Sequence, residues 1–581
     1  MAAPRFKPQT NFTGGEITPL LRGRIDIAAY QNSLARALNA QVLQHGGIRR
    51  RAGTEHVSQV TPSMRTRALP FIYNREQAYV ILITQGLYFV YVAGGEVAGG
   101  SVSPIAQGSV PYYEAQLFEL DYAQSEDTMI ITHAQVAPQV LRRFPDGTWQ
   151  MTTAVFTPPP TRTNDDGQEQ YVWSDNNWPR TVTFHDQRAI YGGSAAFPQE
   201  FVASALGIYF DFTRDPDSDV ESFSYKIQSR QQSAIEYLVS DESLLVLTRS
   251  AEFALRGSND AAISPTNIRS KRQSGHGCAR VRPIEVDDDI IMVQREGQAV
   301  ISLKFDGSAL RYVAEDVSLL AEHLFKSRAV DISYARRPVP TVYVVLENGH
   351  MACCTLDRSQ NVIGWWRWES SYGIIESVAV VPERDTDRVF LVVRRGPRRF
   401  LERVRHDYFP SPYVGGVESM LQTDNSVIYE FDPPVTAVAV PEWMSGYYVT
   451  AVADGEAIDP VYNPTNGIYA LPKPAKRISV GLNYLMEAVP MPPEFPTQAG
   501  TGQGRPVRTI RAVLKVHESI GGTVNDVPII DPDSGITGVN SAEHEVTLDG
   551  WDQDKSQMVI RQREPLPLHV LSVTTYGDNS P

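Results

Sequence analysis

A histidine and a cysteine stand close together, as His276 and Cys278, in a stretch that also holds two glycines. An imidazole beside a thiol is the pairing that activates a cysteine nucleophile, but such a site also needs a third group that orients the base. The sequence around the pair supplies no such group. A tight glycine loop before a strand therefore explains these residues better than a catalytic site does.

Three consecutive aspartates at residues 287–289 could bind a cation. They lack the alternating spacing of a calcium loop, so they fit a solvated turn before a buried strand. The sequence also lacks GxxxxGK[ST], HExxH, CxxC, GxSxG and EF-hand patterns. We therefore expect no catalytic residue, no metal and no cofactor, and we expect that the protein is not an enzyme.

Tryptophans gather in one short run, where Trp365, Trp366 and Trp368 flank Arg367. An aromatic cage for a sugar or a cation is one use of such a run. Large aromatic side chains more often fill the space between neighbouring sheets. We therefore assign Trp178, Trp365, Trp366 and Trp368 to packing between sheets.

The elements that must position these side chains are hairpins that recur along the chain. In the clearest copy, residues 341–346 and 351–356 flank Asn348 and Gly349. Asn-Gly between β-branched runs predicts a hairpin with a type I′ turn, in which both central residues have positive φ. The turn centres recur at intervals of roughly fifty residues, at Gln85, Gln135, Ala195, Ser250, Glu296, Asn348 and Gly396.

A period of that length predicts a β-propeller of about seven blades, each blade a four-stranded sheet. A further strand precedes each hairpin by a short loop, and we expect these to be outer strands of the blades. They lie at residues 67–72, 118–122, 180–184, 234–239, 279–285, 329–334 and 374–381.

The composition fits many short strands joined by tight turns, since the 581 residues include 41 Gly and 40 Pro and 42% are hydrophobic. We expect no membrane-spanning segment, because no run approaches about eighteen apolar residues. We also expect no secretory signal, because the start of the chain has no apolar core. Three cysteines cannot build a disulfide framework, which favours folding in the cytoplasm of the producing cell.

Three regions of the chain differ in character. Residues 1–62 read as an extended, polar N-terminal arm with one helical patch near residues 28–42. Residues 63–405 hold the hairpins and therefore the propeller. Residues 406–581 carry further strand-like runs and Asp-Gly and Asn-Gly turns, which fit a C-terminal β-sandwich or barrel-like module. The expected fold class is mainly β.

Short motifs rich in glycine, arginine and aromatic residues follow one another along nearly the whole chain. They occupy residues 11–16, 19–20, 23–26, 44–54, 122–127, 178–180, 273–277, 316–318, 364–365, 453–455, 481–484 and 502–505. In order and spacing the series resembles the tail nozzle, or tail tubular protein B, family of short-tailed bacteriophages. No single motif is specific, and the series as a whole carries the resemblance.

The resemblance implies a virion structural protein found in the phage tail after folding in the host cytoplasm. It implies a homo-hexamer that sits below the tail adaptor ring (the head-to-tail connector) and extends the DNA-ejection channel. The partners it implies are the adaptor, tail fibre or tailspike proteins, and genomic double-stranded DNA that passes through the lumen without sequence-specific binding.

We expect the arm to dock on the adaptor or on a neighbouring subunit. Residues 1–26 hold few apolar side chains for a core of their own, and such segments gain order mainly from partners. The candidate contact residues are Phe12, Gly14, Gly15, Glu16, Arg24 and Asp26.

The net charge is −14, from 53 basic and 67 acidic residues, whereas proteins that grip nucleic acid are usually basic. An acidic wall suits DNA that must slide past it. Basic clusters lie at residues 49–51, 394–395 and 398–399. We expect these clusters to face neighbouring protein and the lumen to be net acidic or mixed.

Two other classes stay open. A propeller in a tail protein can bind a glycan or cleave a glycoside, and cleavage needs two carboxylates about 5 to 9.5 Å apart. A propeller can also serve as a receptor-binding or scaffold module, which would give a free-standing monomer or trimer with an exposed aromatic patch.

Overall fold

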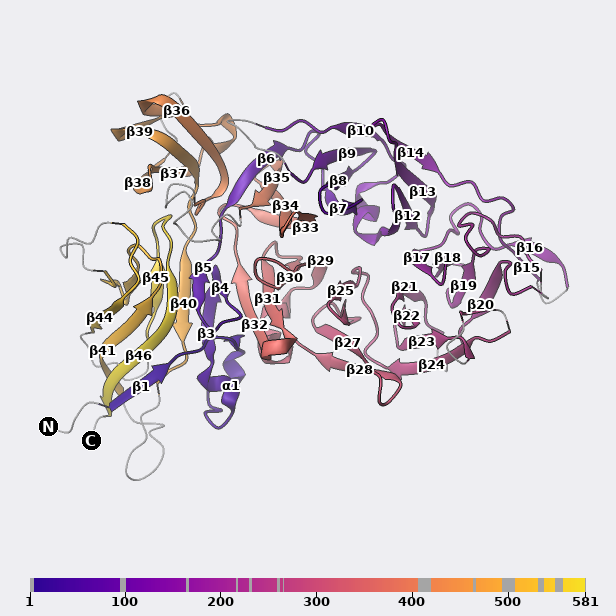
Figure 1. Ribbon diagram of the computed structural model, residues 1–581, viewed down its shortest axis with the longest axis horizontal. Coiled ribbons are helices and arrows are strands. Elements are labelled where there is room, and N and C mark those ends of the chain that lie inside the picture. The colour runs from indigo at the N-terminus through magenta and orange to yellow at the C-terminus, as the bar shows by residue number, and fades with distance from the viewer. Residues whose placement is uncertain are drawn as a thin grey trace.

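A computed structural model describes residues 5–94, 101–163, 167–215, 218–228, 232–258, 262–264, 266–405, 420–462, 467–493, 507–530, 538–548 and 557–579. Strand residues account for 55% and helical residues for 6%, which confirms the mainly β fold class. Figure 1 shows a propeller on one side of the molecule and, beside it, sheets built from the two ends of the chain.

The propeller has seven blades within the described part of the chain, each a four-stranded antiparallel sheet (Figure 1). The strands of each blade are given from the innermost to the outermost. Blade 1 holds β7 (Arg67–Ile72), β8 (Ala78–Thr84), β9 (Leu87–Val92) and β10 (Ala106–Ser109), blade 2 holds β11 (Asp121–Ser125), β12 (Thr128–His133), β13 (Val136–Arg143) and β14 (Trp149–Thr153), and blade 3 holds β17 (Thr181–His185), β18 (Arg188–Gly192), β19 (Glu200–Ala203) and β20 (Phe223–Lys226).

The other four blades follow the same order. Blade 4 holds β21 (Ile235–Ser240), β22 (Leu244–Thr248), β23 (Glu252–Arg256) and β24 (Arg269–Ser274), and blade 5 holds β25 (Ile284–Val286), β26 (Asp289–Val293), β27 (Val300–Asp306) and β28 (Arg311–Asp316). Blade 6 holds β29 (Ala329–Ala335), β30 (Thr341–Leu346), β31 (Met351–Asp357) and β32 (Val362–Trp368), and blade 7 holds β33 (Ile374–Glu383), β34 (Thr386–Arg395), β35 (Arg398–Val404) and β6 (Thr54–Gln59).

The middle strands of the blades read as unbroken apolar runs because neighbouring blades cover both of their faces. β30 is buried at every residue, and β8 is buried at all but Tyr79. The strands predicted as outer strands are instead the innermost ones, since β7, β11, β17, β21, β25, β29 and β33 line the centre of the propeller. Each blade begins at the centre and is built outward, a direction that the hairpin pattern does not reveal.

The turn at Asn348 differs from the predicted type I′ turn. Gly349 has φ +84°, but Asn348 is not among the residues with positive φ. The Gly349 N–H donates to the Leu346 carbonyl at 2.9 Å, and the Leu346 N–H donates to His350 at 2.9 Å. This is a three-residue loop that ends in a left-handed glycine. The Asn348 side chain favours it by accepting the His350 N–H at 3.0 Å.

Blade 7 takes its outer strand from the N-terminal region of the chain. β6 pairs antiparallel with β35, so that Thr54 lies opposite Val404 and Gln59 lies opposite Phe400. The ring of blades is therefore closed by strands from both ends of the propeller sequence. Residues 54–59, which were expected in the arm, belong to the propeller.

The other N-terminal strands are built into a β-sandwich with the C-terminal part of the chain. One sheet of the sandwich continues blade 6 from β32 through β2 (Gly15–Glu16), β3 (Ser33–Leu38), β40 (Met486–Pro490), β45 (Ile560–Gln562), β42 (Thr523–Val524) and β43 (Val527–Pro528). The other sheet holds β4 (Ala40–Val42), β5 (Ile48–Arg50), β46 (His569–Asn579), β41 (Val507–Val516) and β44 (Glu543–Thr547). In this second sheet β1 (Arg5–Gln9) also pairs with β46. The predicted arm is thus folded into the body of its own chain.

A third sheet stands beside blade 7 at the top left of Figure 1. It runs in the order β36 (Asp424–Ala439), β39 (Ile468–Leu482), β37 (Tyr448–Ala453) and β38 (Glu456–Tyr462), and it meets β6 where Ser426 lies opposite Glu55. We refer to it as the platform sheet. The C-terminal region therefore contains this sheet as well as its share of the sandwich.

Helices are short and lie in connections. Among the described residues they are η1 (Pro19–Leu21), α1 (Ala28–Gln31), η2 (Glu114–Glu119), η4 (Leu319–Lys326), η5 (Arg358–Gln360) and η8 (Glu442–Met444). The helical patch predicted near residues 28–42 ends at Gln31, because β3 begins at Ser33 and pairs with β40. No helix among the described residues is long and apolar enough to span a membrane.

One core joins the sandwich to the propeller. A single cluster of buried apolar side chains includes Ile48 and Leu514 of the sandwich, Trp366 of blade 6 and Leu391 of blade 7. Blades 6 and 7 are thus packed against the sandwich through continuous apolar contacts as well as through shared sheets.

Candidate functional site

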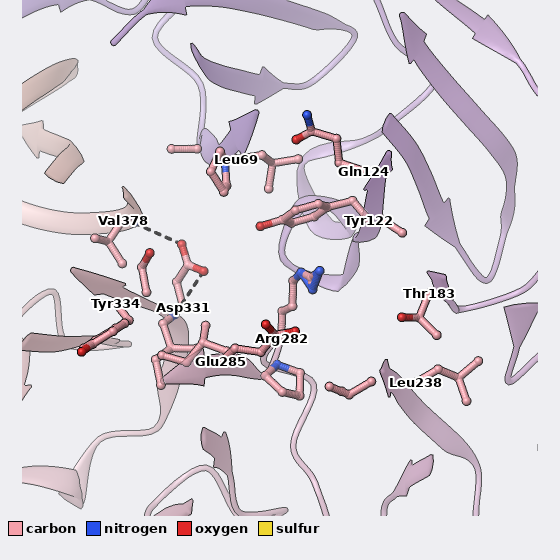
Figure 2. A pocket seen from close by; sticks show the side chains of 18 of the residues that line it. Leu69, Tyr122, Gln124, Thr183, Leu238, Arg282, Glu285, Asp331, Tyr334 and Val378 are labelled. Carbon is pink, nitrogen blue, oxygen red and sulfur yellow. Dashed lines mark hydrogen bonds between the residues drawn. The ribbon is translucent and has the colours of Figure 1, made fainter. Parts of the chain in front are cut away.

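The inner strands of all seven blades line a cavity of about 420 Å³ at the centre of the propeller (Figure 2). Its wall combines charged and aromatic side chains, among them Arg67, Tyr122, Arg282, Glu285 and Asp331. A volume of this size matches a small-molecule site and also holds ordered water.

Asp331 joins three blades at one side of this cavity. Its Oδ2 accepts hydrogen bonds from the Ser377 hydroxyl at 2.5 Å and from the Val378 N–H at 3.1 Å, both in blade 7. The Ser377 Oγ accepts in turn the N–H of Ala68 in blade 1, at 3.0 Å. Burial raises the pKa of Asp331, and the Arg67 guanidinium, 4.0 Å away, opposes that rise.

Asp121 repeats the arrangement across blades 2, 3 and 4. Its Oδ2 accepts the Thr181 hydroxyl at 2.6 Å and the Val182 N–H at 3.3 Å. The Thr181 Oγ1 accepts the N–H of Leu238 in blade 4, at 3.0 Å. Arg282, which precedes blade 5, lies 3.6 Å from the other oxygen of Asp121. Two buried carboxylates, each bonded to a hydroxyl and a backbone N–H and lying near an arginine, therefore tie the blades together around the centre.

Arg282 also faces the cavity, where Figure 2 shows it beneath Tyr122. Its guanidinium lies 4.1 Å from the centre of the Tyr122 ring. Burial raises the pKa of the Tyr122 hydroxyl, and Arg282 opposes that rise. Burial likewise raises the pKa of Glu285. Rings, donors and acceptors in one cavity suit the binding of a small polar molecule.

A smaller cavity of about 210 Å³ lies among residues of blades 2 to 5 and is bridged by Arg280. Its guanidinium donates to the carbonyls of Glu236 at 2.5 Å, Glu119 at 2.6 Å and Arg180 at 2.9 Å. The hydrogen bond from His133 lowers the pKa of Glu119. These contacts, like those of the two aspartates, link neighbouring blades.

Cys278 lies in the tight glycine loop that the sequence suggested. Gly277 has φ +73° and donates its N–H to the Glu252 carboxylate at 2.6 Å. The thiol is 1% exposed, and burial raises its pKa, whereas a reactive thiol needs a lowered pKa. The arrangement is structural.

The three aspartates at 287–289 form the turn between β25 and β26. Asp287 has φ +53° and pairs with Arg336 at 2.9 Å. Asp289 is buried, accepts the Ser302 hydroxyl at 2.7 Å and pairs with Arg358 at 3.1 Å. Across the described ranges, no cluster of three or more His, Cys, Asp or Glu side chains is suited to a metal ion.

The tryptophans assigned to packing lie between sheets. Trp365 is 2% exposed, packs edge-to-face on Phe325 and donates its indole N–H to the Val317 carbonyl at 2.8 Å. Trp366 and Trp368 project from the other face of β32 into the core that joins propeller and sandwich. Trp178 packs, partly buried, between blades 2 and 3. Buried rings offer no cage to a ligand.

Four of the six residues expected to contact another subunit make contacts within this chain. Phe12 is 0% exposed in the joined core, and Gly14 donates its N–H to the Asn32 carbonyl at 2.9 Å. Gly15 has φ +60°, and a Cβ there would overlap the backbone of Trp365. Phe12, Gly15 and Glu16 are thus buried in contacts within this chain, whereas Gly14 is partly exposed; contact of these residues with another subunit stays a prediction.

Glu16 is a buried charge that links the N-terminal strands to blade 6. Its carboxylate accepts the Arg367 Nε–H at 2.9 Å and the Ala37 N–H at 2.9 Å, and it lies 2.7 Å from Nε2 of His323. Burial opposes ionisation, but the hydrogen bonds from His323 and Arg367 lower the pKa of Glu16.

Arg24 and Asp26 are the two predicted contact residues that are exposed, with side chains 56% and 63% exposed, paired to each other at 2.8 Å. They follow Leu20, which is 79% exposed, beside Leu319, which is 63% exposed. The N–H of Thr18 donates to the carbonyl of the residue after Leu319, so this loop lies against η4. We refer to residues 18–26 and η4 as the leucine corner.

The arginines at 49–51 form the joint between the sandwich and the rest of the chain. Arg51 makes two 2.8 Å hydrogen bonds to Asp424, and its guanidinium lies 3.6 Å from the ring centre of Tyr484. Arg50 donates to Asn483 at 2.9 Å and to the Tyr484 carbonyl at 2.7 Å. Burial lowers the pKa of Arg50, whereas Asp424 raises that of Arg51 against the effect of burial.

The second basic cluster is also neutralised inside the chain. Arg394 and Arg399 pair with Glu376 at 3.3 and 2.7 Å, and Arg398 pairs with Glu442 at 3.2 Å. Arg395 pairs with a buried glutamate of β35. The expectation that the basic clusters face neighbouring protein is wrong for Arg49, Arg50, Arg51 and Arg395, which are buried. For Arg394 and Arg398, whose side chains are 37% exposed, it stays a prediction.

The sequence reasoning missed the residues that hold the centre together, which include Arg67, Asp121, Thr181, Arg282, Asp331 and Ser377. The sequence feature that could have indicated them is an aspartate or a hydroxyl-bearing residue near the start of each inner strand. One motif of the resemblance, residues 502–505, lies outside the described residues.

Comparisons with known proteins extend the description of the fold only. No protein-family model and no curated protein matches the chain. Among solved structures, the chain is similar to the Neurospora crassa Pan2 WD40 domain (10% identity, 61% of this chain and 96% of that chain, TM-score 0.35). It is also similar to the Myceliophteria thermophila Cps50 (Swd1) β-propeller domain (9%, 61% and 100%, TM-score 0.37) and to BBS1N in complex with ARL6DN (7%, 62% and 97%, TM-score 0.33).

Proposed function

We propose that this chain is a virion structural protein, the subunit of the tail nozzle of a short-tailed bacteriophage. In this proposal, a homo-hexamer docks below the tail adaptor ring and extends the channel through which genomic double-stranded DNA leaves. Tail fibre or tailspike proteins attach to the same assembly. The protein reaches the virion tail after folding in the host cytoplasm and acts without catalysis.

The observation that carries the proposal is where the motifs of the resemblance meet. Residues 11–16 pack on residues 364–365, where Gly15 lies opposite Trp365. Residues 44–54 contact residues 481–484 through the hydrogen bond of Arg50 to Asn483. Motifs that are far apart in the sequence thus form one joint between propeller and sandwich, which gives their residue types a common structural role and supports the resemblance.

The size of the central cavity favours a channel between copies. The cavity has a volume of about 420 Å³, and paired side chains cross it. Duplex DNA is too wide for such a space, since its major groove alone is about 12 Å wide. A single propeller therefore does not conduct DNA. A closed ring of copies supplies a wider lumen, and closed cyclic symmetry is the usual form of homo-oligomers.

The leucine corner supports contact between subunits. Leu20 and Leu319 are both more than half exposed, on a loop and a helix that the hydrogen bond from Thr18 to the Leu320 carbonyl holds together, and exposed apolar patches mark interaction sites. The exposed pair Arg24 and Asp26 borders them. We propose that this corner, rather than a free N-terminal arm, contacts the adaptor ring or the neighbouring subunit.

Native mass spectrometry of the full chain, alone and with the adaptor ring, tests the proposal. We expect six copies of the 64.6 kDa chain, seen as a ring with an open centre by electron microscopy. A chain that stays monomeric in both conditions and is absent from purified tails would overturn the proposal. Leu20→Ser with Leu319→Ser should weaken the ring, whereas Leu310→Ser, which removes another exposed leucine, should not.

A glycan-binding or glycoside-cleaving tail protein is the second candidate, and the central cavity favours it. Tyr122, Arg282 and Glu285 offer a ring face, donors and a carboxylate in one small space. Titration with host surface glycans tests this function. Binding that Glu285→Gln abolishes would support it, and a loss of reducing-end release in the same variant would add a catalytic role.

A further inference from the structure

Blade 4 ends in an outer strand that is unusually basic. β24 carries Arg269, Lys271 and Arg272, and all three are exposed. In the basic clusters that the sequence singled out, Arg49 and Arg50 are buried, and carboxylates of the same chain pair with the others, which are Arg51, Arg394, Arg395, Arg398 and Arg399. By contrast, none of the three cations of β24 forms an ion pair with a carboxylate in the described ranges, and Arg272 donates to the Ser274 carbonyl at 3.1 Å.

Protection of an exposed sheet edge does not by itself explain why three basic residues lie in β24. Exposed edges carry lysine or arginine because these residues discourage pairing with foreign strands. The other outer strands that remain uncovered in the described part of the propeller are β10, β14, β20 and β28. β10 and β14 carry no basic residue and β20 carries one. β28 carries one arginine together with two acidic residues.

The fold fixes the three cations on one edge strand, with Arg269 and Lys271 on one face and Arg272 on the other. β24 pairs with β23, where Ala254 lies opposite Lys271 and Phe253 lies opposite Arg272. Gln273 accepts the Tyr312 N–H at 2.8 Å and so fastens β24 to the outer strand of blade 5. Arg269 and Lys271 project from the same face of the strand, about 6.6 to 6.8 Å apart.

We propose that β24 is the surface through which this protein contacts the phosphodiester backbone of duplex DNA. This inference rests on the proposed function, in which DNA passes the protein. It goes further by naming the strand that contacts the DNA. The argument is charge complementarity: three exposed cations, for which the described residues give no ion pair, lie within four residues of one edge strand, on a chain whose net charge is −14. Such contacts are independent of base sequence, because phosphates carry no sequence information.

A short basic edge also agrees with DNA that must slide. Each phosphate neutralised by a cation releases counterions, and log K falls with log salt by about 0.9 per contact. Three contacts give a slope of about −2.7, which means weak binding that salt readily reverses. This basic edge, repeated once per subunit of the proposed ring, would guide the duplex without gripping it.

Fluorescence anisotropy with short duplexes of unrelated sequence tests the proposal on the full chain. The test variant is Arg269→Gln, Lys271→Gln, Arg272→Gln. The matched control is Arg75→Gln, Arg142→Gln, Arg384→Gln, which removes the same charge from three exposed arginines of blades 1, 2 and 7. We expect the native chain and the control to bind all duplexes equally, with a salt slope of about −2.7, and the test variant to lose at least tenfold in affinity.

Three results would overturn the proposal: equal loss in the test and control variants, undiminished binding by the test variant, or no binding by the native chain at low salt. Reduced self-association of the test variant in native mass spectra, without a change in DNA binding, would show that β24 faces an acidic surface of a second copy instead. The ring assay for the proposed function is independent. A hexamer that does not bind DNA would reject only this inference, and a DNA-binding monomer would reject only the ring.

Discussion

The hydroxyl of Thr181 lies 2.6 Å from Oδ2 of Asp121, and on the other side of the propeller centre the hydroxyl of Ser377 lies 2.5 Å from Oδ2 of Asp331. In both places the hydroxyl oxygen also accepts a backbone N–H from the next blade. The blades are therefore connected by hydrogen bonds at the centre as well as by apolar packing between their faces.

Removal of one of these hydroxyls should destabilise the propeller. Ser377→Ala leaves the buried Asp331 carboxylate and the Ala68 N–H each short of a partner, which costs about 1–3 kcal/mol. The denaturant midpoint of unfolding measures the change. Ser359→Ala removes an exposed hydroxyl that also bonds an aspartate, at 2.7 Å, and should shift the midpoint little. Equal shifts in both variants would contradict this account of the centre.

Gly15→Ala should destabilise the joint between the N-terminal strands and blade 6. Gly15 has φ +60°, and an added Cβ would overlap the backbone of Trp365, which cannot move without breaking β32. Gly86→Ala is the control, because Gly86 has φ +77° with open space around it. Both variants pay the cost of positive φ, about 1–2 kcal/mol, so the thermal unfolding temperature should fall clearly further for Gly15→Ala. Equal falls would mean that steric overlap contributes nothing.

Acidification should loosen the closure of blade 7 at His56 of β6. This ring stacks on Trp443 with 4.2 Å between centres, and its nitrogens lie within 3.0 Å of Asn425 and Ser101. Burial lowers the pKa of His56 from 6.5 to about 4. The unfolded chain therefore binds the proton more tightly, and stability is lost as the pH falls from 6.5 towards 4, by roughly 2 kcal/mol at pH 5.

The difference in unfolding midpoint between pH 7 and pH 5 measures this loss. His56→Gln should be less stable than the native chain at pH 7 and should show a smaller difference between the two pH values. His45→Gln, at an exposed histidine, should keep the native difference. An unchanged difference in His56→Gln would assign the acid sensitivity to other groups.

The thiols should resist alkylation in the folded protein. Cys278, Cys353 and Cys354 are all buried, and burial raises the pKa of each. Mass spectrometry after iodoacetamide treatment should find no label until denaturant is added. Ser359→Cys, at an exposed position, serves as the positive control. Rapid labelling of Cys278 in the native chain would reopen the nucleophile that His276 suggested.

The hairpins could be predicted from the sequence because neighbouring blades bury both faces of their strands. A strand such as β30, buried at every residue, appears as an apolar run between turn residues. The direction of each blade could not be predicted, since a strand before a hairpin has the same composition whether it lies inside or outside. The turn at Gly349 was recognised, but its type depended on the contacts of Asn348.

The joint and the centre could not be predicted because their partners are distant in the sequence. Arg51 reads as part of a surface basic cluster until it is paired with Asp424. Asp331 reads as an isolated aspartate in a strand until blade 7 brings Ser377 to it. The sequence shows side chains that need a partner, and only the assembled blades show which partner each one has.

The first strands of this chain find their partners among the last. β1 pairs with β46, which ends at Asn579, and β6 must wait for β35 to be made. During translation the leading segment therefore emerges from the ribosome long before anything can pair with it, and unpaired strands are prone to aggregate. A ribosome that stops early releases a chain whose sandwich lacks its central strand. The sandwich can therefore be completed only after β46 has been made, although its first strands are made at the start of the described chain.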